Sequence, residues 1–244
     1  MKEPPSHRRS KGSPPAALRE TCRVVDGRIP LWPYHRARLL AGGCRDGVLD
    51  RAESLAIEAA ADWGTTGSPR VRLSITIGED GEVSLDVRRR LSSLDVVHGP
   101  IAVRVAAREV PDLPPGAAKP ADRGWWDAAQ SQARLEGGHQ AVIVGPGDEV
   151  IDGGTATVWI AEGPRLVTPP SPPAVAGVAR AFLMRQAPTI GLHIDVEPIS
   201  WRRFEVADEA MLTNAFGGVV AVRKRGRYVF EAVSALFDEM WRAV

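Results

Sequence analysis

Residues 111–123 read PDLPPGAAKPADR, and this stretch divides the chain into two halves. Its first part, residues 111–118, is rich in proline, glycine and alanine, a composition typical of a linker because it interrupts regular structure. Lys119 follows directly, at the start of the second half. We therefore predict an α+β protein of two domains. Residues 17–110 would form a small N-terminal α+β domain and residues 119–244 a C-terminal α/β domain.

Upstream of the linker, apolar residues follow helix and strand periodicities in turn. Residues 1–16 carry prolines and charges but few apolar side chains, so we predict a flexible tail there. The pair Asp26-Gly27 is typical of a tight turn, and we expect it to join two strands of a hairpin. The expected elements are strands at 19–25, 28–31, 71–77, 83–87 and 101–107, and helices at 34–41 and 50–63.

Downstream of the linker, short apolar strands alternate with helical stretches. Turn residues such as Pro146-Gly147-Asp148 separate the strands. Helices are expected at 124–135, 175–186 and 231–241, with a short helical turn at 206–210, and strands at 141–144, 150–151, 156–160, 166–167, 194–199, 211–215 and 219–222.

The composition is that of an ordinary globular protein. Hydrophobic residues make up 44% and charged residues 25% of the 244 residues, so the chain can bury a core without disulfides. The 31 basic and 30 acidic residues give a formal charge of +1, which does not indicate a nucleic-acid partner. No apolar run is long enough for a membrane span, and the N-terminus does not have the pattern of a signal peptide. With only two cysteines, a reducing cytoplasm is the expected location.

Several common catalytic and metal-binding motifs are missing from the sequence. There is no Gly-x-x-x-x-Gly-Lys-Ser/Thr loop, no Gly-x-Gly-x-x-Gly after a strand and no Gly-x-Ser-x-Gly turn. The five histidines are scattered and lack ligand spacing with either cysteine. We therefore expect no metal site.

Lysine is scarce in this chain. Of the 31 basic residues only Lys2, Lys11, Lys119 and Lys224 are lysines. This matters because a lysine amine can lose its proton and act as a nucleophile, whereas arginine stays charged. Lys2 and Lys11 lie in the expected tail, and Lys224 lies in a run of arginines. Lys119 is therefore the candidate for an amine with a chemical role.

Seven segments form an ordered series along the chain. They are residues 20–27 (ETCRVVDG), 35–39 (HRARL), 119–123 (KPADR), 149–159 (EVIDGGTATVW), 166–170 (LVTPP), 177–180 (GVAR) and 212–222 (LTNAFGGVVAV). In this order they resemble the class IV aminotransferases, pyridoxal-phosphate enzymes of fold type IV, and among these aminodeoxychorismate lyase most closely. The resemblance covers about residues 17–222. It implies a cofactor in the cleft between the two domains, a small amino substrate and a homodimer.

The resemblance also assigns roles to individual residues. It implies that Lys119 holds pyridoxal phosphate through its amine and moves protons at the substrate carbon, with a pKa lowered by burial and a cationic neighbour. Arg38 matches the family's phosphate-binding arginine. The backbone N–H groups of Gly177, Val178 and Ala179 would lie at a helix N-terminus on the phosphate. Asn214-Ala215 would face the phosphate from the other side.

Two more residues of these segments are candidates for contact with the cofactor ring. Asp152 stands where the family has a glutamate that keeps the pyridine nitrogen protonated. Arg123 would lie beside the ring's phenolate oxygen or a substrate carboxylate, unless it is a solvent-facing arginine at a helix start. We expect Trp125-Trp126 to be core residues.

The chain departs from the family pattern at three points. Asp152 is one methylene shorter than the family's glutamate, and Ala179 replaces a threonine found in many members. The strand that usually precedes the Glu-Thr segment is replaced by a proline-rich stretch. Three hypotheses follow: a lyase that converts 4-amino-4-deoxychorismate to 4-aminobenzoate and pyruvate for folate synthesis, an amino-acid aminotransferase of the branched-chain or D-amino-acid type, and a relative without catalytic turnover.

Overall fold

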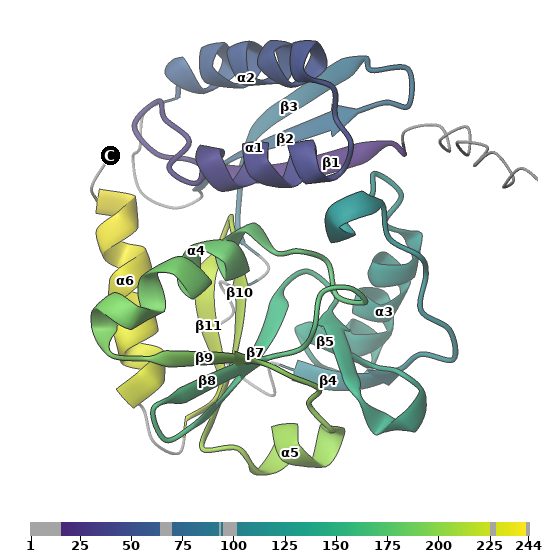
Figure 1. Ribbon diagram of the computed structural model, residues 1–244, viewed down its shortest axis with the longest axis vertical. Coiled ribbons are helices and arrows are strands. Elements are labelled where there is room, and N and C mark those ends of the chain that lie inside the picture. The colour runs from purple at the N-terminus through teal and green to yellow at the C-terminus, as the bar shows by residue number, and fades with distance from the viewer. Residues whose placement is uncertain (1–15, 64–69, 93, 95–101, 225–227, 243–244) are drawn as a thin grey trace, which may run out of the picture.

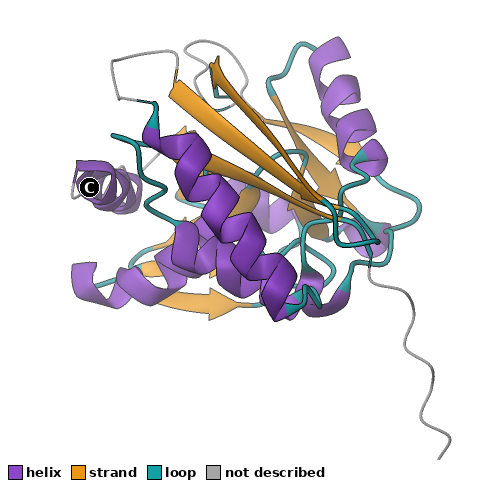
Figure 2. Cartoon of the chain, turned by 90° about the horizontal axis from the view of Figure 1, so that it is seen from above, coloured by secondary structure: helices purple, strands orange, loops and turns teal. Residues whose placement is uncertain are grey.

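The computed structural model describes residues 16–63, 70–92, 94, 102–224 and 228–242. Residues 1–15, most of the expected flexible tail, therefore lie outside the described residues. Figure 1 shows a three-stranded sheet with two helices at the top and a larger body of sheets and helices beneath it. Helices α3 and α6 lie on opposite sides of that body (Figure 1), and the view from above keeps helices at the periphery on both sides of the strands (Figure 2).

The upper part is built from β1 (Leu18–Val24), α1 (Trp32–Ala41), α2 (Asp46–Ala61), β2 (Arg70–Ile77) and β3 (Val83–Arg90). The strands form an antiparallel sheet in the order β1-β2-β3. One face of the sheet packs its apolar side chains with those of the two helices. The opposite face bears polar side chains, because successive residues of a strand alternate between faces.

The hairpin expected at residues 19–31 is wrong in its second strand. The turn at Asp26-Gly27 forms, with positive φ at both residues, but only the single bridge Val25–Arg28 follows it. The chain then enters α1, and β1 pairs with β2 instead. Pro30 and Pro33 explain the difference, because proline cannot donate a backbone hydrogen bond to a strand partner and is well accepted in the first turn of a helix.

A second sheet crosses the expected boundary at residue 110. Strand β4 (Ala102–Ala106) pairs in parallel with β5 (Gln140–Val144), and β5 pairs with β6 (Val150–Gly153). Helix α3 (Gly124–Leu135), where the sequence predicted it, packs on β4 and β5. Because β4 joins strands of the second half, its pairing differs from the expectation that it belongs with the first half. The division of the chain into domains stays a prediction.

The largest sheet has the strand order β11-β10-β7-β8-β9. Buried apolar residues join it to helices α4 and α6 in one core. Its strands are β7 (Thr157–Glu162), β8 (Arg165–Thr168), β9 (His193–Val196), β10 (Glu209–Asn214) and β11 (Gly218–Lys224), and its helices are α4 (Val178–Gln186), α5 (Trp201–Val206) and α6 (Tyr228–Arg242). Short 3₁₀ turns occur at Pro115–Ala117, Pro146–Asp148 and Ala187–Ile190.

The short helix expected at residues 206–210 is wrong. Helix α5 instead covers Trp201–Val206, and residues from Glu209 onward are a strand. Ser200 explains the earlier start, because its hydroxyl accepts a hydrogen bond from the Arg203 backbone N–H at 3.1 Å and so caps the helix. None of the helices in the described ranges combines the length and apolarity that a bilayer crossing needs.

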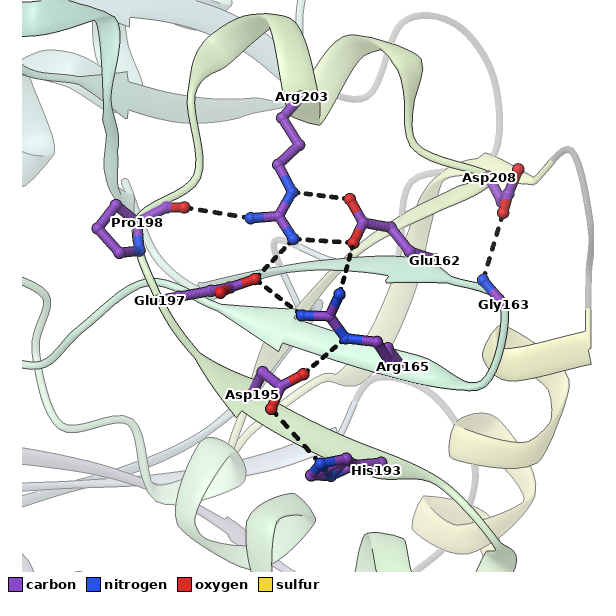
Figure 3. A network of polar contacts seen from close by, with 9 residues as sticks. All are labelled: Glu162, Gly163, Arg165, His193, Asp195, Glu197, Pro198, Arg203 and Asp208. Carbon is purple, nitrogen blue, oxygen red and sulfur yellow. Dashed lines mark hydrogen bonds and ion pairs between the residues drawn. The ribbon is translucent and has the colours of Figure 1, made fainter.

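A network of ion pairs joins α5 to the strands β7, β8 and β9 at the outer edge of the large sheet (Figure 3). Arg203 donates through Nε and Nη2 to the two carboxylate oxygens of Glu162, at 2.7 and 2.8 Å, and also to Glu197 at 2.6 Å. Arg165 donates to Asp195 at 2.7 Å and to Glu197 at 3.0 Å. Each guanidinium in this network therefore has carboxylate partners on more than one element.

Candidate active site

A cavity of about 550 Å³ lies between the polar face of the three-stranded sheet and the larger body. It is lined from both halves of the chain. The residues that the sequence singled out all line it: Arg38, Lys119, Arg123, Asp152, Gly177, Val178, Ala179, Asn214 and Ala215. The structure thus brings together every predicted site residue, although their roles toward a ligand stay predictions.

Lys119 is the only lysine among the described residues that line the cavity. Its backbone carbonyl accepts the Arg19 N–H of β1 at 3.0 Å, and its Nζ donates to the hydroxyl of Thr21 at 3.0 Å. Burial, together with the charges of Arg123 and Arg38, lowers the pKa of Lys119 to about 7. A large fraction of this amine is therefore neutral near pH 7 and can act as a base or nucleophile.

Arg38, on α1, is held by a buried carboxylate. Its guanidinium donates to both oxygens of Glu20, through Nε at 2.8 Å and through Nη2, and Nη1 donates to the carbonyl of Ala176 at 2.9 Å. His35 Nδ1 also donates to Glu20, at 2.6 Å. Burial alone raises the pKa of Glu20, but Arg38 and His35 outweigh it and bring this pKa down to about 2. The arginine is thereby fixed at the cavity wall.

The N-terminus of helix α4 opens into the same cavity wall. Gly177 is the residue before the helix, so the expected helix start at residue 175 is wrong and the start implied by the family resemblance is confirmed. A Cβ atom at Gly177 would collide with the hydroxyl of Thr157, so a side chain does not fit there. The first backbone N–H groups of a helix have no partner within it. With Arg38 bonded to the carbonyl of Ala176 next to them, these groups suit a phosphate.

Asn214 and Ala215 lie at the turn between β10 and β11. The Asn214 amide donates to the carbonyl of Thr155 at 3.1 Å, and its oxygen accepts the N–H groups of Phe216 and Gly217 at 3.1 and 2.6 Å. The side chain of Asn214 thus shapes this turn, and the turn lines the cavity. Both ends of the Asn214 amide are bonded to backbone groups, and the prediction that Asn214 and Ala215 face a phosphate stays a prediction.

Asp152 is buried at the end of β6. Its carboxylate accepts three N–H groups: from Gly153 at 2.9 Å, from Val175 at 3.2 Å and from the Trp126 indole at 3.3 Å. Burial raises the pKa of Asp152 to about 6, and the backbone N–H of Val175 and the charge of Arg123 limit the rise. The carboxylate is therefore mostly ionised at pH 7 and can balance a protonated ring nitrogen.

Arg123 lies over the face of Trp126, with its guanidinium carbon 4.1 Å from the ring centroid. Its Nη2 donates to the carbonyl of Gly154 at 3.2 Å, while Nη1 is buried without a hydrogen-bond partner. Burial lowers the pKa of Arg123 to about 10. A buried donor without a partner is costly, so an acceptor on a ligand in the cavity would stabilise this nitrogen. The contacts of Trp126 with Arg123 and Asp152 were not foreseen from the sequence, which indicated only a core residue.

The sequence matches the family model described as amino-transferase class IV over residues 17–224. The chain belongs to the class IV aminotransferase family. Membership makes it a pyridoxal-phosphate-dependent enzyme, and the family resemblance noted in the sequence is confirmed. A search of curated proteins found no match.

Solved structures confirm the α+β fold of this class IV aminotransferase. A fold IV transaminase from Curtobacterium pusillum is 16% identical with a TM-score of 0.74, and covers 93% of this chain and 86% of its own. A hypothetical aminotransferase from Mycobacterium tuberculosis with bound PLP is 19% identical with a TM-score of 0.73, at 92% and 88% coverage. A protein from Legionella pneumophila, described provisionally as a 4-amino-4-deoxychorismate lyase, is 17% identical with a TM-score of 0.73, at 92% and 91% coverage.

The described residues fit pyridoxal phosphate in this class IV aminotransferase. The cavity offers a buried amine at Lys119, a cationic pole at Arg38 and the α4 N-terminus, and a buried carboxylate at Asp152. The unpartnered Nη1 of Arg123 adds a donor between these groups. In the part of the chain that the structure describes, no group of three or more His, Cys, Asp or Glu side chains is placed to hold a metal ion.

Proposed function

We propose that this protein is a pyridoxal-phosphate-dependent 4-amino-4-deoxychorismate lyase, which releases 4-aminobenzoate and pyruvate. The observation that carries the proposal is the buried amine of Lys119, with a pKa of about 7, inside a cavity lined by several cationic side chains. A neutral amine can take a proton from carbon, and cationic walls suit a substrate with carboxylates. The provisional lyase description of a similar solved structure supports this choice.

In this proposal the cofactor lies in the cavity between the two halves. Lys119 holds it through the amine, and Arg38 with the N–H groups at the start of α4 binds its phosphate. Asp152 keeps the pyridine nitrogen protonated. Pyridoxal phosphate, when bound, takes up the electron pair that is left when a bond at the amine-bearing carbon of the substrate breaks.

Lys119 carries the proton transfer. With the cofactor and substrate bound, the Lys119 amine, neutral near pH 7, would remove the proton from the ring carbon that bears the substrate amine. Thr21 accepts a hydrogen bond from Nζ at 3.0 Å and so holds the amine in the cavity. Cleavage of the ring carbon–oxygen bond would then release enolpyruvate, which takes up the proton to become pyruvate, and the aromatic ring of 4-aminobenzoate would remain.

A second candidate function is an amino-acid aminotransferase of the branched-chain or D-amino-acid type, which would use the same lysine and cofactor. Aminotransferases among the similar solved structures favour it. Product analysis separates the two functions. A lyase forms 4-aminobenzoate and pyruvate from one substrate, whereas an aminotransferase forms a new amino acid from an added keto acid.

The first experiment is the absorbance spectrum of the protein purified with pyridoxal phosphate. We expect a cofactor band that borohydride reduction fixes covalently on the wild type and not on Lys119→Ala. Thr21→Val, which leaves the amine in place, is the matched control and should keep the covalent product. A wild type that shows no cofactor band would favour a relative without turnover, a hypothesis motivated by Asp152 and Ala179. In that case Asp152→Glu tests whether the family's longer carboxylate restores binding.

We also propose that the enzyme works as a homodimer in the cytoplasm and supplies 4-aminobenzoate for folate synthesis. The dimer is tested by light scattering of the cofactor-loaded protein, which should give twice the 26.3 kDa of one chain. Supply of 4-aminobenzoate is tested by expressing the protein in a bacterial strain that requires this compound for growth. Growth without the compound supports the proposal, and growth only with it argues against the lyase.

A further inference from the structure

The wall of the cavity that the three-stranded sheet forms carries arginines that the proposed chemistry does not use. Arg19 on β1, Arg72 on β2 and Arg90 on β3 all line the cavity. They come from the polar face of the three-stranded sheet, the face on which Thr21 reaches Lys119. The strand register puts them there, because Arg23 is opposite Arg72 and Arg70 is opposite Arg90, so the odd-numbered positions of β1 share a face with the even-numbered positions of β2 and β3.

These three arginines have few acidic partners. Arg72 pairs with Asp86 at 3.6 Å, but Asp86 already accepts a closer hydrogen bond from Arg88 at 2.9 Å. The Nε of Arg72 is buried and has no hydrogen-bond partner. Among the described residues, no ion pair with a carboxylate is formed by Arg19 or Arg90. The sheet face therefore holds more positive charge than the chain neutralises.

The charges also act on one another. Burial lowers the pKa of Arg72, and the neighbouring charges of Arg90 and Arg19 lower it further. Arg19 in turn acts on Lys119, since it contributes to the lowering of that pKa. The three arginines thus form a cationic row that leads from the reactive amine along the sheet. Like charges held together in a cavity favour the binding of an anion that spans them.

The two acids that line the cavity do not neutralise this row. Asp152 is enclosed by three N–H donors. Asp127 is on α3, and its charge acts on Arg123, whose pKa it raises. When the amine of a substrate reaches Lys119, the group at the other end of that substrate therefore lies near these arginines.

We propose that Arg72, with Arg19 and Arg90 beside it, forms the subsite for a second carboxylate of the substrate, so that this pocket selects dianionic amino substrates. The inference rests on the proposed function and deepens it, because it names the residues of that site that determine substrate choice. Guanidinium groups are well suited to this task because they present paired N–H donors to a carboxylate. A substrate with an uncharged group at this position would leave the three arginines without a carboxylate partner and would bind weakly.

The test uses benzene-1,3-dicarboxylate and benzoate as probes, titrated into the cofactor-loaded protein by calorimetry at low salt. The wild type should bind the dicarboxylate at least about tenfold more tightly, the effect expected for one extra charged hydrogen-bonded group. In Arg72→Gln the preference should fall by about tenfold, with smaller losses in Arg19→Gln and Arg90→Gln. Arg72→Lys keeps the charge and should keep most of the preference.

The matched control is Arg89→Gln. Arg89 is on the same strand as Arg90 but on the opposite face, with its guanidinium 5.8 Å from the Trp63 ring centroid. This variant removes an equal charge and should leave the preference unchanged. Circular dichroism confirms folding. Should Arg72→Gln fail to fold, Arg90→Gln at its exposed position carries the same test.

The outcomes separate this inference from the proposed function. A wild type that binds both probes equally, or a preference that survives in all three glutamine variants, overturns the subsite. If the lyase assay gives no 4-aminobenzoate while the preference is present and falls in the variants, the proposed function fails and the subsite stands. If 4-aminobenzoate forms and the preference survives in all three glutamine variants, the function stands and the subsite fails.

Discussion

Arginines occur in two regions of this molecule under opposite conditions. In the network at the outer edge, Arg165 and Arg203 each bind several carboxylates, and the network is partly exposed. In the cavity, Arg72 and Arg123 each keep a buried nitrogen without a hydrogen-bond partner. The same side chain therefore stabilises the fold in one region and is left available for ligands in the other. Between these two groups of arginines, a buried nitrogen without a hydrogen-bond partner is found in the cavity and not in the edge network.

The largest effect on activity is expected when the amine of Lys119 in the cavity is removed. Lys119→Ala should lower kcat by about 10³- to 10⁴-fold or more, since it removes the proton-transferring group. Stability should change little, because Lys119 donates only to Thr21 among the described residues. Initial rates of 4-aminobenzoate formation measure the loss. A variant that keeps more than a tenth of wild-type activity would place the base elsewhere.

The second effect is at Glu20, which does not line the cavity and behaves like a scaffold residue. Glu20→Gln leaves the charge of Arg38 buried without its partner and should lower the free energy of unfolding by about 3–5 kcal/mol. The control is Glu53→Gln, whose partner Arg36 is at a partly exposed site, so that the loss should stay below about 1 kcal/mol. Urea unfolding of the two variants measures both losses. Equal losses would contradict the conclusion that the buried ion pair of Glu20 and Arg38 stabilises the fold more than the exposed pair does.

The Glu20 effect also depends on pH. Its pKa in the folded protein is about 2, below the ordinary value of 4.5. The stability that the ionised carboxylate provides is therefore fully present above about pH 4.5 and is lost as pH falls toward 2. The difference in unfolding free energy between wild type and Glu20→Gln should narrow over this interval, and a constant difference would argue against the ion pair as its cause.

The third effect is a shift of the pH profile. Because the neutral form of Lys119 is the base, kcat should rise as pH increases through about 7 and then level off. Arg123 is the neighbouring charge that lowers this pKa most. Arg123→Gln should therefore move the rising limb to higher pH. The profile of Arg89→Gln should match that of wild type, and a limb that does not move in Arg123→Gln would rule out this electrostatic role.

The smallest effect is expected in the edge network. Arg203→Ala should lower the free energy of unfolding by about 1 kcal/mol, because partly exposed ion pairs contribute little and are screened by salt. The loss should shrink further at high salt, and activity should stay at the wild-type level. Thermal melts at two salt concentrations test this. A loss of activity would show that the two regions are coupled.

Local sequence signals predicted most of the fold and residues that the structure brings together around the cavity. Lys119, Arg38 and Asp152 were found because each lies in a short motif, and helix α3 was placed correctly by its periodicity. The strands β1 and β4 form where the sequence predicted them, but their partners lie far along the chain and were not predicted. Strand β4 pairs with β5 across the linker, and β1 pairs with β2 rather than with its neighbour in sequence. Local periodicity does not encode such pairing.

The same limit explains the site residues that sequence reasoning missed. Glu20 was noted only as part of a segment. Its hydrogen bonds with Arg38 depend on how α1 packs against β1. Arg19, Arg72 and Arg90 are separated by many residues and come to one face of the sheet only because of strand register. A chain with arginine as its main basic residue offers no way to single these three out before the sheet is formed.

Strand β1 has a consequence for insertions and deletions. Its alternate residues divide two tasks, since Glu20 holds Arg38 on one face while Arg19 and Thr21 reach the cavity on the other. Adding or removing one residue within the strand would turn each side chain to the wrong face. The turn at residues 78–82, between β2 and β3, contributes no residue to the cavity lining. We expect insertions and deletions, natural or engineered, to be tolerated at that turn and not in β1.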